Sequence, residues 1–263
     1  MKIEFYKYHG TGNDFIIIDD RSSRIDLSQS AIAQLCHRRF GIGADGLMLL
    51  RTIEAYDFEM VYYNSDGKTS SMCGNGGRCL VAFAHRMGVV NDKAYFKAID
   101  GAHSAYFHSS QRVSLHMNQV NELERIGADW VLDTGSPHYL KFVDPGLMKL
   151  GSFITEARRI RQSESFEKEG INVNFIELSG TTDLKMRTFE RGVEDETYSC
   201  GTGAVAAAIG AHAQQDLKEG QFLMDIKTPG GPLQVRFDHY EGTYSEVTLI
   251  GPAQMVFRGE IEI

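Results

Sequence analysis

The chain has 263 residues, of which 42% are hydrophobic and 24% are charged, and its formal net charge is −8. This balance predicts a globular, soluble protein, and an acidic chain without a basic block is not expected to bind nucleic acid. The apolar runs are far too short to span a membrane, which excludes a membrane protein.

The cysteine content narrows the class of protein further. Four cysteines are too few and too scattered for a disulfide scaffold: Cys36, Cys73, Cys79 and Cys200. No pair of ligands has the short spacing of a zinc site, so we expect no metal. Residues 1–6 alternate like a strand and lack the apolar core of a signal peptide, and we expect a cytoplasmic protein.

The first part of the chain predicts strands and one amphipathic helix. Residues 2–8 and 15–19 have the character of strands, on either side of a turn at His9–Asp14. Apolar residues on one side of residues 28–39 predict a helix. Two further strands are expected, at 47–51 and 58–63.

Residues 41–46 read Gly-Ile-Gly-Ala-Asp-Gly and match the glycine pattern of dinucleotide-binding proteins. That pattern must follow a strand and open a helix. Here it follows the helix over 28–39 and enters the strand over 47–51. We therefore reject a nucleotide cofactor at this motif.

The most informative stretch is Asn64–Arg78, in which Cys73 is followed by Gly-Asn-Gly-Gly. It leaves the strand over 58–63 and enters an apolar segment at 79–87, which predicts a buried helix that stops at Gly88. Cys73 is thereby placed at or just before a helix N-terminus. At such a position the helix dipole and the N–H groups of the first turn stabilise a thiolate.

The middle of the chain predicts a change of domain. Three short alternating segments between 94 and 117 are typical of antiparallel strands, and the polar residues 118–129 follow them. A strand over 130–134 leads into Gly135–His138, a tight turn that would hold His138 at a strand end. A histidine in such a constrained turn is a better functional candidate than most.

The rest of the chain predicts one more helix and a series of strands. The helix lies within 145–163, with Leu147 and Ile154 among its apolar residues, and with Arg158, Arg159 and Arg161 facing solvent. Strands are expected from 170 to 175 and at 184–189, 222–228, 233–239, 244–250 and 253–263.

The second half of the chain repeats the cysteine arrangement. Cys200 is followed by Gly-Thr-Gly and then by an apolar segment at 205–213. We therefore predict an α/β (α+β) fold of two similar domains, each a curved, mainly antiparallel sheet around a central apolar helix. A single cysteine of this kind is often buried and inert, but two in matching contexts favour one site between two thiols.

Two thiols on opposite sides of a carbon atom can invert it, because one removes a proton and the other delivers a proton to the opposite face. The carbon next to a carboxylate is weakly acidic, so the developing charge needs fixed hydrogen-bond donors. Candidate donors are the N–H groups at the two helix starts: Gly74, Asn75, Gly201 and Thr202. His138 and Glu190 are candidates to set the protonation of the sulfurs, and no lysine has an obvious pyridoxal context, so no cofactor is expected.

Six segments together resemble the diaminopimelate epimerase family, in the family's order and over nearly the whole chain. They are His9–Phe15, Asn64–Cys79, Gly135–His138, Asn172–Phe175, Glu190–Gly192 and Cys200–Gly203. The resemblance implies a PLP-independent, two-base isomerase that interconverts LL- and meso-2,6-diaminopimelate in lysine and peptidoglycan precursor biosynthesis. It also implies an N-terminal domain, 1–117 with a returning strand at 252–263, and a C-terminal domain, 118–251.

The resemblance also implies roles for particular residues. Cys73 and Cys200 would be the catalytic acid–base pair, tuned by His138 and Glu190. The reacting carboxylate end of the substrate would be bound by Gly74, Asn75, Gly201 and Thr202. The distal amino acid group would be bound by Asn13, Asn64, Asn172, Glu190 and Arg191. An arginine fork suits a carboxylate, and amide or carboxylate oxygens suit an ammonium group.

Three positions depart from the family pattern: Gly46 stands where some members carry Gln, Ser136 replaces an Asn, and 193–197 is one residue longer than usual. Three other functions stay open. They are a racemase or isomerase of the same superfamily acting on another amino acid such as proline, a Cys–His hydrolase using Cys73 and His138, and a non-catalytic binding module. We expect a small amino acid as the partner and leave a homodimer open.

Overall fold

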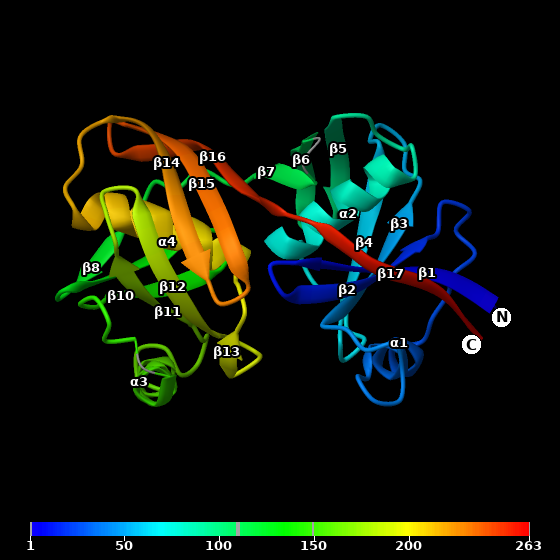
Figure 1. The fold of residues 1–263 in the computed structure, drawn as a ribbon, viewed down its shortest axis with the longest axis horizontal. Coiled ribbons are helices and arrows are strands. Elements are labelled where there is room, and N and C mark those ends of the chain that lie inside the picture. The colour runs from blue at the N-terminus through cyan, green and yellow to red at the C-terminus, as the bar shows by residue number, and fades with distance from the viewer. Residues whose placement is uncertain (1, 109–110, 149, 263) are drawn as a thin grey trace. The chain divides into compact units, whose positions relative to one another are not determined.

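The computed structural model describes residues 2–108, 111–148 and 150–262. The chain divides into two compact units: the N-terminal unit, Met1–Leu115 with Gly251–Ile263, and the C-terminal unit, His116–Ile250. Strands dominate both units, and four helices lie within the described residues (Figure 1). This confirms the predicted α/β (α+β) fold class.

The N-terminal unit contains two parallel strand pairs within a mainly antiparallel sheet. Its elements are β1 (Lys2–Gly10), β2 (Asn13–Asp19), α1 (Gln29–Cys36), β3 (Gly46–Arg51), β4 (Phe58–Asn64), α2 (Gly74–Arg86), β5 (Lys93–Ala98), β6 (Gly101–His108), β7 (Arg112–His116) and β17 (Gln254–Glu262). β2 pairs parallel with β3, and β4 with β5. Helices α1 and α2 are therefore the crossovers that parallel pairs require, and β17 returns to pair antiparallel with β1 (Figure 1).

The C-terminal unit repeats this order of elements. It contains β8 (Glu124–Ile126), β9 (Asp129–Asp133), β10 (Pro137–Phe142), α3 (Leu150–Arg161), β11 (Asn172–Leu178), β12 (Asp183–Glu190), β13 (Asp195–Thr197), α4 (Gly201–Gln214), β14 (Gly220–Thr228), β15 (Gly231–Tyr240) and β16 (Thr243–Pro252). β10 pairs parallel with β11 across α3, and β12 with β14 across α4. The duplicated cysteine motif is thus one part of a duplicated topology.

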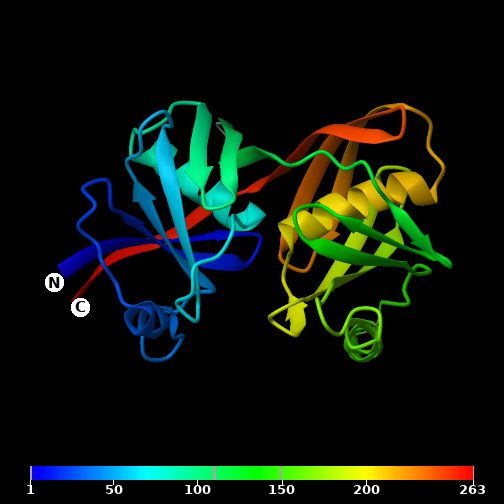
Figure 2. The ribbon, with the colours of Figure 1, turned by 180° about the vertical axis from the view of Figure 1, so that it is seen from behind.

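Side chains alternate along each strand, so each sheet has two different faces. One face is directed toward the central helix of the unit, α2 or α4, and the other toward its outer helix, α1 or α3. In β11, Val173 and Phe175 pack with Phe153 of α3. The next side chains point the other way, and Ile176 belongs to the core cluster that contains the apolar residues of α4. Figure 2 shows α4 lying across the strands of its unit, with α3 on the outer side.

The central helices are buried, as their apolar sequences predict. All residues of Gly74–Ala84 in α2 are buried, and so are Gly201 and Gly203–His212 in α4. Close packing explains one of the glycines, because a Cβ at Gly210 would lie 2.2 Å from Cδ1 of the buried Leu140 in β10.

The structure corrects three details of the C-terminal unit. The short strands β8 and β13 were not predicted. Leu147 precedes α3 and is 59% exposed, whereas Phe153 fills the apolar position in the core. The prediction that Arg161 faces solvent was wrong, because its guanidinium is largely buried and pairs with Glu194 at 3.1 Å.

Candidate active site

The predicted site residues of each unit lie near the ends of strands and at the first turn of the central helix. In the N-terminal unit, Asn13 begins β2 and Asn64 ends β4. In the C-terminal unit, His138 is the second residue of β10, Asn172 begins β11 and Glu190 ends β12. The same topological positions are therefore used twice, and each half is described below by itself.

Cys73 is the N-cap residue of α2, with the extended backbone that this position requires (φ −97°, ψ 130°). The first hydrogen bond of the helix runs from the N–H of Gly77 to the Cys73 carbonyl at 2.7 Å. The N–H of Gly74 belongs to the first turn, which a helix cannot satisfy internally. The partly exposed Cys73 thiol donates to Oδ1 of Asn13 at 3.6 Å.

The two asparagines of this half lie close to the sulfur. Asn75 donates from Nδ2 to Oδ1 of Asn13 at 3.3 Å, and Asn13 in turn donates from Nδ2 to Asp45 at 2.7 Å. Asn64 is exposed, and its side chain makes no hydrogen bond within the described part of the chain. Asn64 is therefore the side chain of this set that a ligand can engage without displacing a protein contact.

Cys200 is the N-cap residue of α4 and has the same extended backbone. Its sulfur accepts the N–H of Gly203 at 3.4 Å and lies 3.4 Å from the hydroxyl oxygen of Thr202. Hydrogen bonds donated to sulfur, together with the positive end of the helix dipole, favour a thiolate over a thiol. The sequence prediction of a helix-start cysteine therefore holds in both units.

His138 is fully buried and neutral. Burial, reinforced by the positive charge of Arg191, lowers the pKa of His138 to about 3. Its Nδ1 faces the Nδ2 amide group of Asn174 at 3.1 Å, and its Nε2 lies 3.0 Å from the Thr202 hydroxyl. Asn174 accepts the hydroxyl of Thr188 at its Oδ1 and donates from Nδ2 to the Tyr139 carbonyl.

These contacts assign the tautomer of His138. Because Asn174 presents donors to Nδ1, that nitrogen is the acceptor and the ring proton sits on Nε2. Nε2 then donates to the Thr202 hydroxyl oxygen, and the hydroxyl proton is left to point toward Cys200. His138 is thus connected to Cys200 by two hydrogen bonds, with the Thr202 hydroxyl between them. The predicted effect of His138 on the protonation of the sulfur would act through these two bonds.

We predict that Thr202→Val shifts the pH profile of Cys200 alkylation to higher pH and slows alkylation at pH 7 by about tenfold. The hydroxyl that donates to the sulfur is lost, and one such bond contributes on the order of 1 kcal/mol or more. Iodoacetamide labelling followed by mass spectrometry measures the rate. Thr202→Ser keeps the hydroxyl and is the matched control, and equal rates for both variants would contradict the chain.

Arg191 and Asn172 form the polar end of the C-terminal half. Asn172 accepts the backbone N–H of Arg191 at 2.9 Å and donates to the Ser136 hydroxyl at 2.9 Å. The exposed guanidinium of Arg191 donates to the Glu169 carbonyl at 3.1 Å and to Ser136 at 3.4 Å. Ser136, which departs from the family pattern, is therefore the acceptor that both side chains share.

Glu190 lies beside this group at the end of β12. Its Oε2 accepts the hydroxyl of Thr197 from β13 at 2.8 Å. The longer segment that separates Arg191 from Cys200 forms a hairpin, in which Glu190 is paired with Asp195. Residues 191–194 are therefore the turn of this hairpin, ahead of the cysteine.

The other two cysteines have the opposite character. Burial raises the pKa of the Cys36 thiol to about 11 and raises that of Cys79 even further. Neither side chain is a thiolate at neutral pH, and all four cysteines are free. Within the described residues, no cluster of three or more His, Cys, Asp or Glu side chains is placed to hold a metal ion.

Sequence reasoning assigned no role to one residue that positions the site, Asn174. Asn174 orients His138, and its signal was the Asn-Val-Asn pattern of residues 172–174, which puts both asparagines on one face of β11. Gly46 needs to be a glycine, since a Cβ there would lie 2.6 Å from the Tyr63 carbonyl oxygen. A Gln at position 46 would therefore require the neighbouring strand to move.

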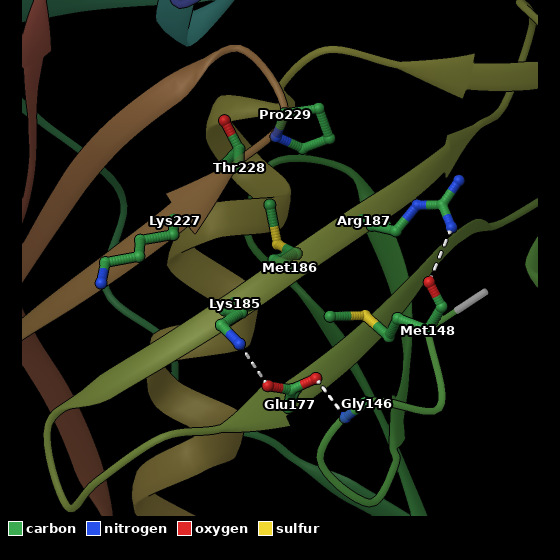
Figure 3. Close-up of a pocket in the computed structure, with 9 residues that line it drawn as sticks. All are labelled: Gly146, Met148, Glu177, Lys185, Met186, Arg187, Lys227, Thr228 and Pro229. Atoms are coloured by element: carbon green, nitrogen blue, oxygen red, sulfur yellow. Dashed lines mark hydrogen bonds and ion pairs between the residues drawn. The ribbon is translucent and has the colours of Figure 1, made fainter. Parts of the chain in front are cut away.

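A separate hollow of about 350 Å³ lies on the C-terminal unit and contains none of the predicted site residues. In Figure 3, Lys185 and the backbone of Gly146 both bind Glu177, and Arg187 reaches the Met148 carbonyl. Arg187 also pairs with Glu196 at 2.6 Å. Since these charges are already compensated by the protein, we assign no function to this hollow.

Comparison with known proteins identifies a family. The family model for diaminopimelate epimerase matches residues 5–121 and 130–256. A protein named diaminopimelate epimerase from Flavobacterium psychrophilum is 45% identical over 262 residues, covering 98% of this chain and 100% of the relative. One of the same name from Chlorobaculum tepidum is 42% identical, covering 97% and 99%. None of the helices within the described ranges is long and apolar enough to cross a membrane.

Solved structures share the fold at low sequence identity. A PhzF-family phenazine biosynthesis protein from Bacillus anthracis matches with a TM-score of 0.77 and 12% identity, covering 100% of both chains. A probable proline racemase from Agrobacterium radiobacter matches with a TM-score of 0.69 and 14% identity, covering 99% of this chain and 93% of that one. At this identity the likeness concerns the fold alone.

Proposed function

The chain belongs to the diaminopimelate epimerase family, and we propose that it is an amino-acid isomerase that interconverts LL- and meso-2,6-diaminopimelate. This reaction would serve lysine and peptidoglycan precursor biosynthesis in the cytoplasm. The observation that carries the proposal is the duplication of the site. Each unit begins its buried central helix with a cysteine whose sulfur meets polar partners at the first turn.

We propose a two-base mechanism without a cofactor. The thiolate of one of the pair Cys73 and Cys200 removes the α-proton, and the thiol of the other delivers a proton to the opposite face. In the reverse direction the two sulfurs exchange roles. The carbanion that develops next to the carboxylate is stabilised by fixed donors, for which we propose the first turns of both central helices: Gly74, Asn75, Gly201 and Thr202.

We propose that the distal amino acid group lies at the end of the site formed by Asn13, Asn64, Asn172, Glu190 and Arg191. Arg191 is well suited, because its exposed guanidinium is fixed by Ser136 and Glu169 and keeps further donors for a carboxylate. Asn172 already uses its amide groups within the protein, so we assign it the task of holding Arg191 in place. Asn64 and Glu190 would receive the ammonium group.

Arg191→Lys is expected to weaken the apparent affinity for diaminopimelate by about 10- to 100-fold, with a smaller effect on turnover. A lysine offers a point charge where a fixed, planar fork is needed, and it cannot reach both Ser136 and the Glu169 carbonyl in the same way. The Michaelis constant for each epimer measures the effect. Arg158→Lys, on the exposed side of α3, is the matched control, and an unchanged Michaelis constant for Arg191→Lys would remove Arg191 from the site.

An epimerisation assay tests the proposed function. Purified protein without added cofactor should convert LL-diaminopimelate to the meso form, and the reverse, until equilibrium is reached. L-Proline, offered under the same conditions, should stay unchanged, because the polar Asn, Glu and Arg set does not suit a small apolar ring. Racemisation of proline, or no conversion of diaminopimelate, would contradict the proposal.

A further inference from the structure

Two charged residues outside the proposed site, Arg78 and Asp45, end a chain of side-chain hydrogen bonds that passes Cys73. Arg78 donates from NH2 to Oδ1 of Asn75 at 2.8 Å. Asn75 donates to Oδ1 of Asn13 at 3.3 Å, and Asn13 donates to Asp45 at 2.7 Å. The chain therefore runs from a guanidinium through two amides to a carboxylate.

Arg78 is an unusual end point, because it is 0% exposed and has no carboxylate partner within the described residues. Its NH1 donates to the Gly74 carbonyl at 3.1 Å, and burial lowers its pKa to about 10. An unpaired buried charge is costly. The groups that compensate it are the carbonyl of Gly74 and the amide oxygen of Asn75, both at the start of α2.

Asp45 is the other end point and comes from the glycine motif at 41–46, for which the sequence offered no role. Its carboxylate pairs with Arg38 at 2.6 Å and accepts the backbone N–H of Asp14 at 3.2 Å. Lys7 and Arg38 both bind Asp14 as well, so the surrounding charges form one compact cluster. The remaining acceptor capacity of Asp45 is directed at the amide of Asn13.

Arg78 and Asp45, at the two ends of the hydrogen-bond chain, determine the orientation of the side-chain amides of Asn75 and Asn13. A guanidinium only donates, so the oxygen of Asn75 faces Arg78 and its Nδ2 faces Asn13. A carboxylate only accepts, so Nδ2 of Asn13 faces Asp45. Both conditions place the same atom, Oδ1 of Asn13, toward the sulfur of Cys73 at 3.6 Å. A flipped Asn13 would instead present N–H groups to the sulfur and favour the thiolate.

Building on the proposed function, we propose that Arg78 and Asp45 are positioning residues that fix the amide of Asn13, so that its oxygen accepts the thiol proton of Cys73. Asp45 acts through the orientation of the amide and favours the protonated sulfur. Arg78 fixes Asn75 and adds a positive charge that favours the ionised sulfur. The balance between them keeps Cys73 able to serve as the acid in one direction and as the base in the other.

The test is the pH profile of Cys73 alkylation by iodoacetamide in the full-length protein, followed by peptide mass spectrometry. In Asp45→Asn the carboxylate, which only accepts, is replaced by an amide that can also donate, so only Asn75 still fixes the orientation of Asn13. The fraction of Asn13 that turns its Nδ2 to the sulfur should rise, and the midpoint of the alkylation profile should move down by about one pH unit. The Asp45 side chain is 43% exposed, so this variant should fold. Turnover should fall several-fold, with a smaller change in the Michaelis constants.

Asp14→Asn is the matched control. It removes a carboxylate from the same Arg38 and Lys7 cluster but leaves the Asn13–Asp45 hydrogen bond in place. The midpoint of the Cys73 alkylation profile in Asp14→Asn should move by less than a third of the shift that Asp45→Asn causes. If both variants shift the profile equally, or if Asp45→Asn leaves it unchanged, the orienting role of Asp45 is refuted.

Arg78→Met should move the midpoint in the opposite direction, to higher pH, and Arg78→Lys should restore most of the original profile. Thermal unfolding shows whether these buried substitutions fold, and Asp45→Asn tests the proposal independently of them. A shift of Arg78→Met to lower pH would overturn the role of Arg78. Alkylation needs no substrate, so a wild-type protein that fails to epimerise diaminopimelate would refute the proposed function without altering these outcomes.

Discussion

Cys73→Ala and Cys200→Ala are each expected to lower epimerisation by at least about a thousandfold, in both directions. General acid–base groups contribute factors of roughly 10² to 10⁴, and the proposed reaction needs one such group on each face of the carbon. Both cysteines are N-cap residues whose backbone alanine can adopt. Turnover of LL- and meso-diaminopimelate measures the loss, and circular dichroism checks the fold.

Cys36→Ala is the control for this experiment. Cys36 is a buried thiol in the cluster under α1 and takes no part in the proposed chemistry, so its replacement should preserve turnover. A Cys–His hydrolase that used Cys73 and His138 would not need Cys200. Near-normal epimerisation by either Cys73→Ala or Cys200→Ala would therefore contradict the two-thiol mechanism.

The second large effect concerns the stability of the C-terminal unit below neutral pH. His138 has an ordinary pKa of 6.5 when unfolded and a pKa of about 3 in the folded protein, because burial excludes its charged form. Between these values the unfolded chain binds one more proton than the folded protein does. The free energy of unfolding should therefore fall as pH is lowered from 6.5, by about 1.4 kcal/mol per pH unit.

His138→Gln should remove this contribution. The free energy of unfolding should then depend less steeply on pH between pH 6.5 and 4.5, by the equivalent of about one bound proton. Urea unfolding at several pH values measures the slope. Burial also lowers the pKa of His212, but that residue is present in both proteins. Burial raises the pKa of Asp14, but its bonds to Arg38 and Lys7 outweigh that and hold it at about 2, so its contribution is lost only below pH 4. An unchanged slope would show that His138 is not the buried neutral histidine described here.

Local patterns explain what could be predicted from the sequence. A cysteine followed by Gly-x-Gly and an apolar run indicates a helix start, and both cysteines are N-cap residues. The alternation of the strands and the apolar character of α2 and α4 likewise depend on neighbours in the chain. The order of the motifs led to the family resemblance, and the match of the family model confirms that family.

The remaining features depend on contacts between distant segments. The tautomer of His138 is set by Asn174, which reaches it because β10 and β11 are parallel, 36 residues apart in the chain. Arg161 was misassigned because its partner, Glu194, lies in the hairpin after β12. Asp45 belongs to the glycine motif at 41–46, which the sequence alone excludes as a nucleotide site. The sequence could not assign a role to Asp45, because its contact with Asn13 spans 32 residues.

The most direct measurement of the central claim is the fate of the α-protons in deuterium oxide. LL-diaminopimelate is incubated with the protein, and substrate and product are examined by NMR at low conversion. Two different bases, one on each face, predict that the meso product carries solvent deuterium at the inverted carbon while the remaining substrate keeps its protium. Deuterium appearing equally in recovered substrate and product, or inversion without solvent label, would contradict a reaction between Cys73 and Cys200.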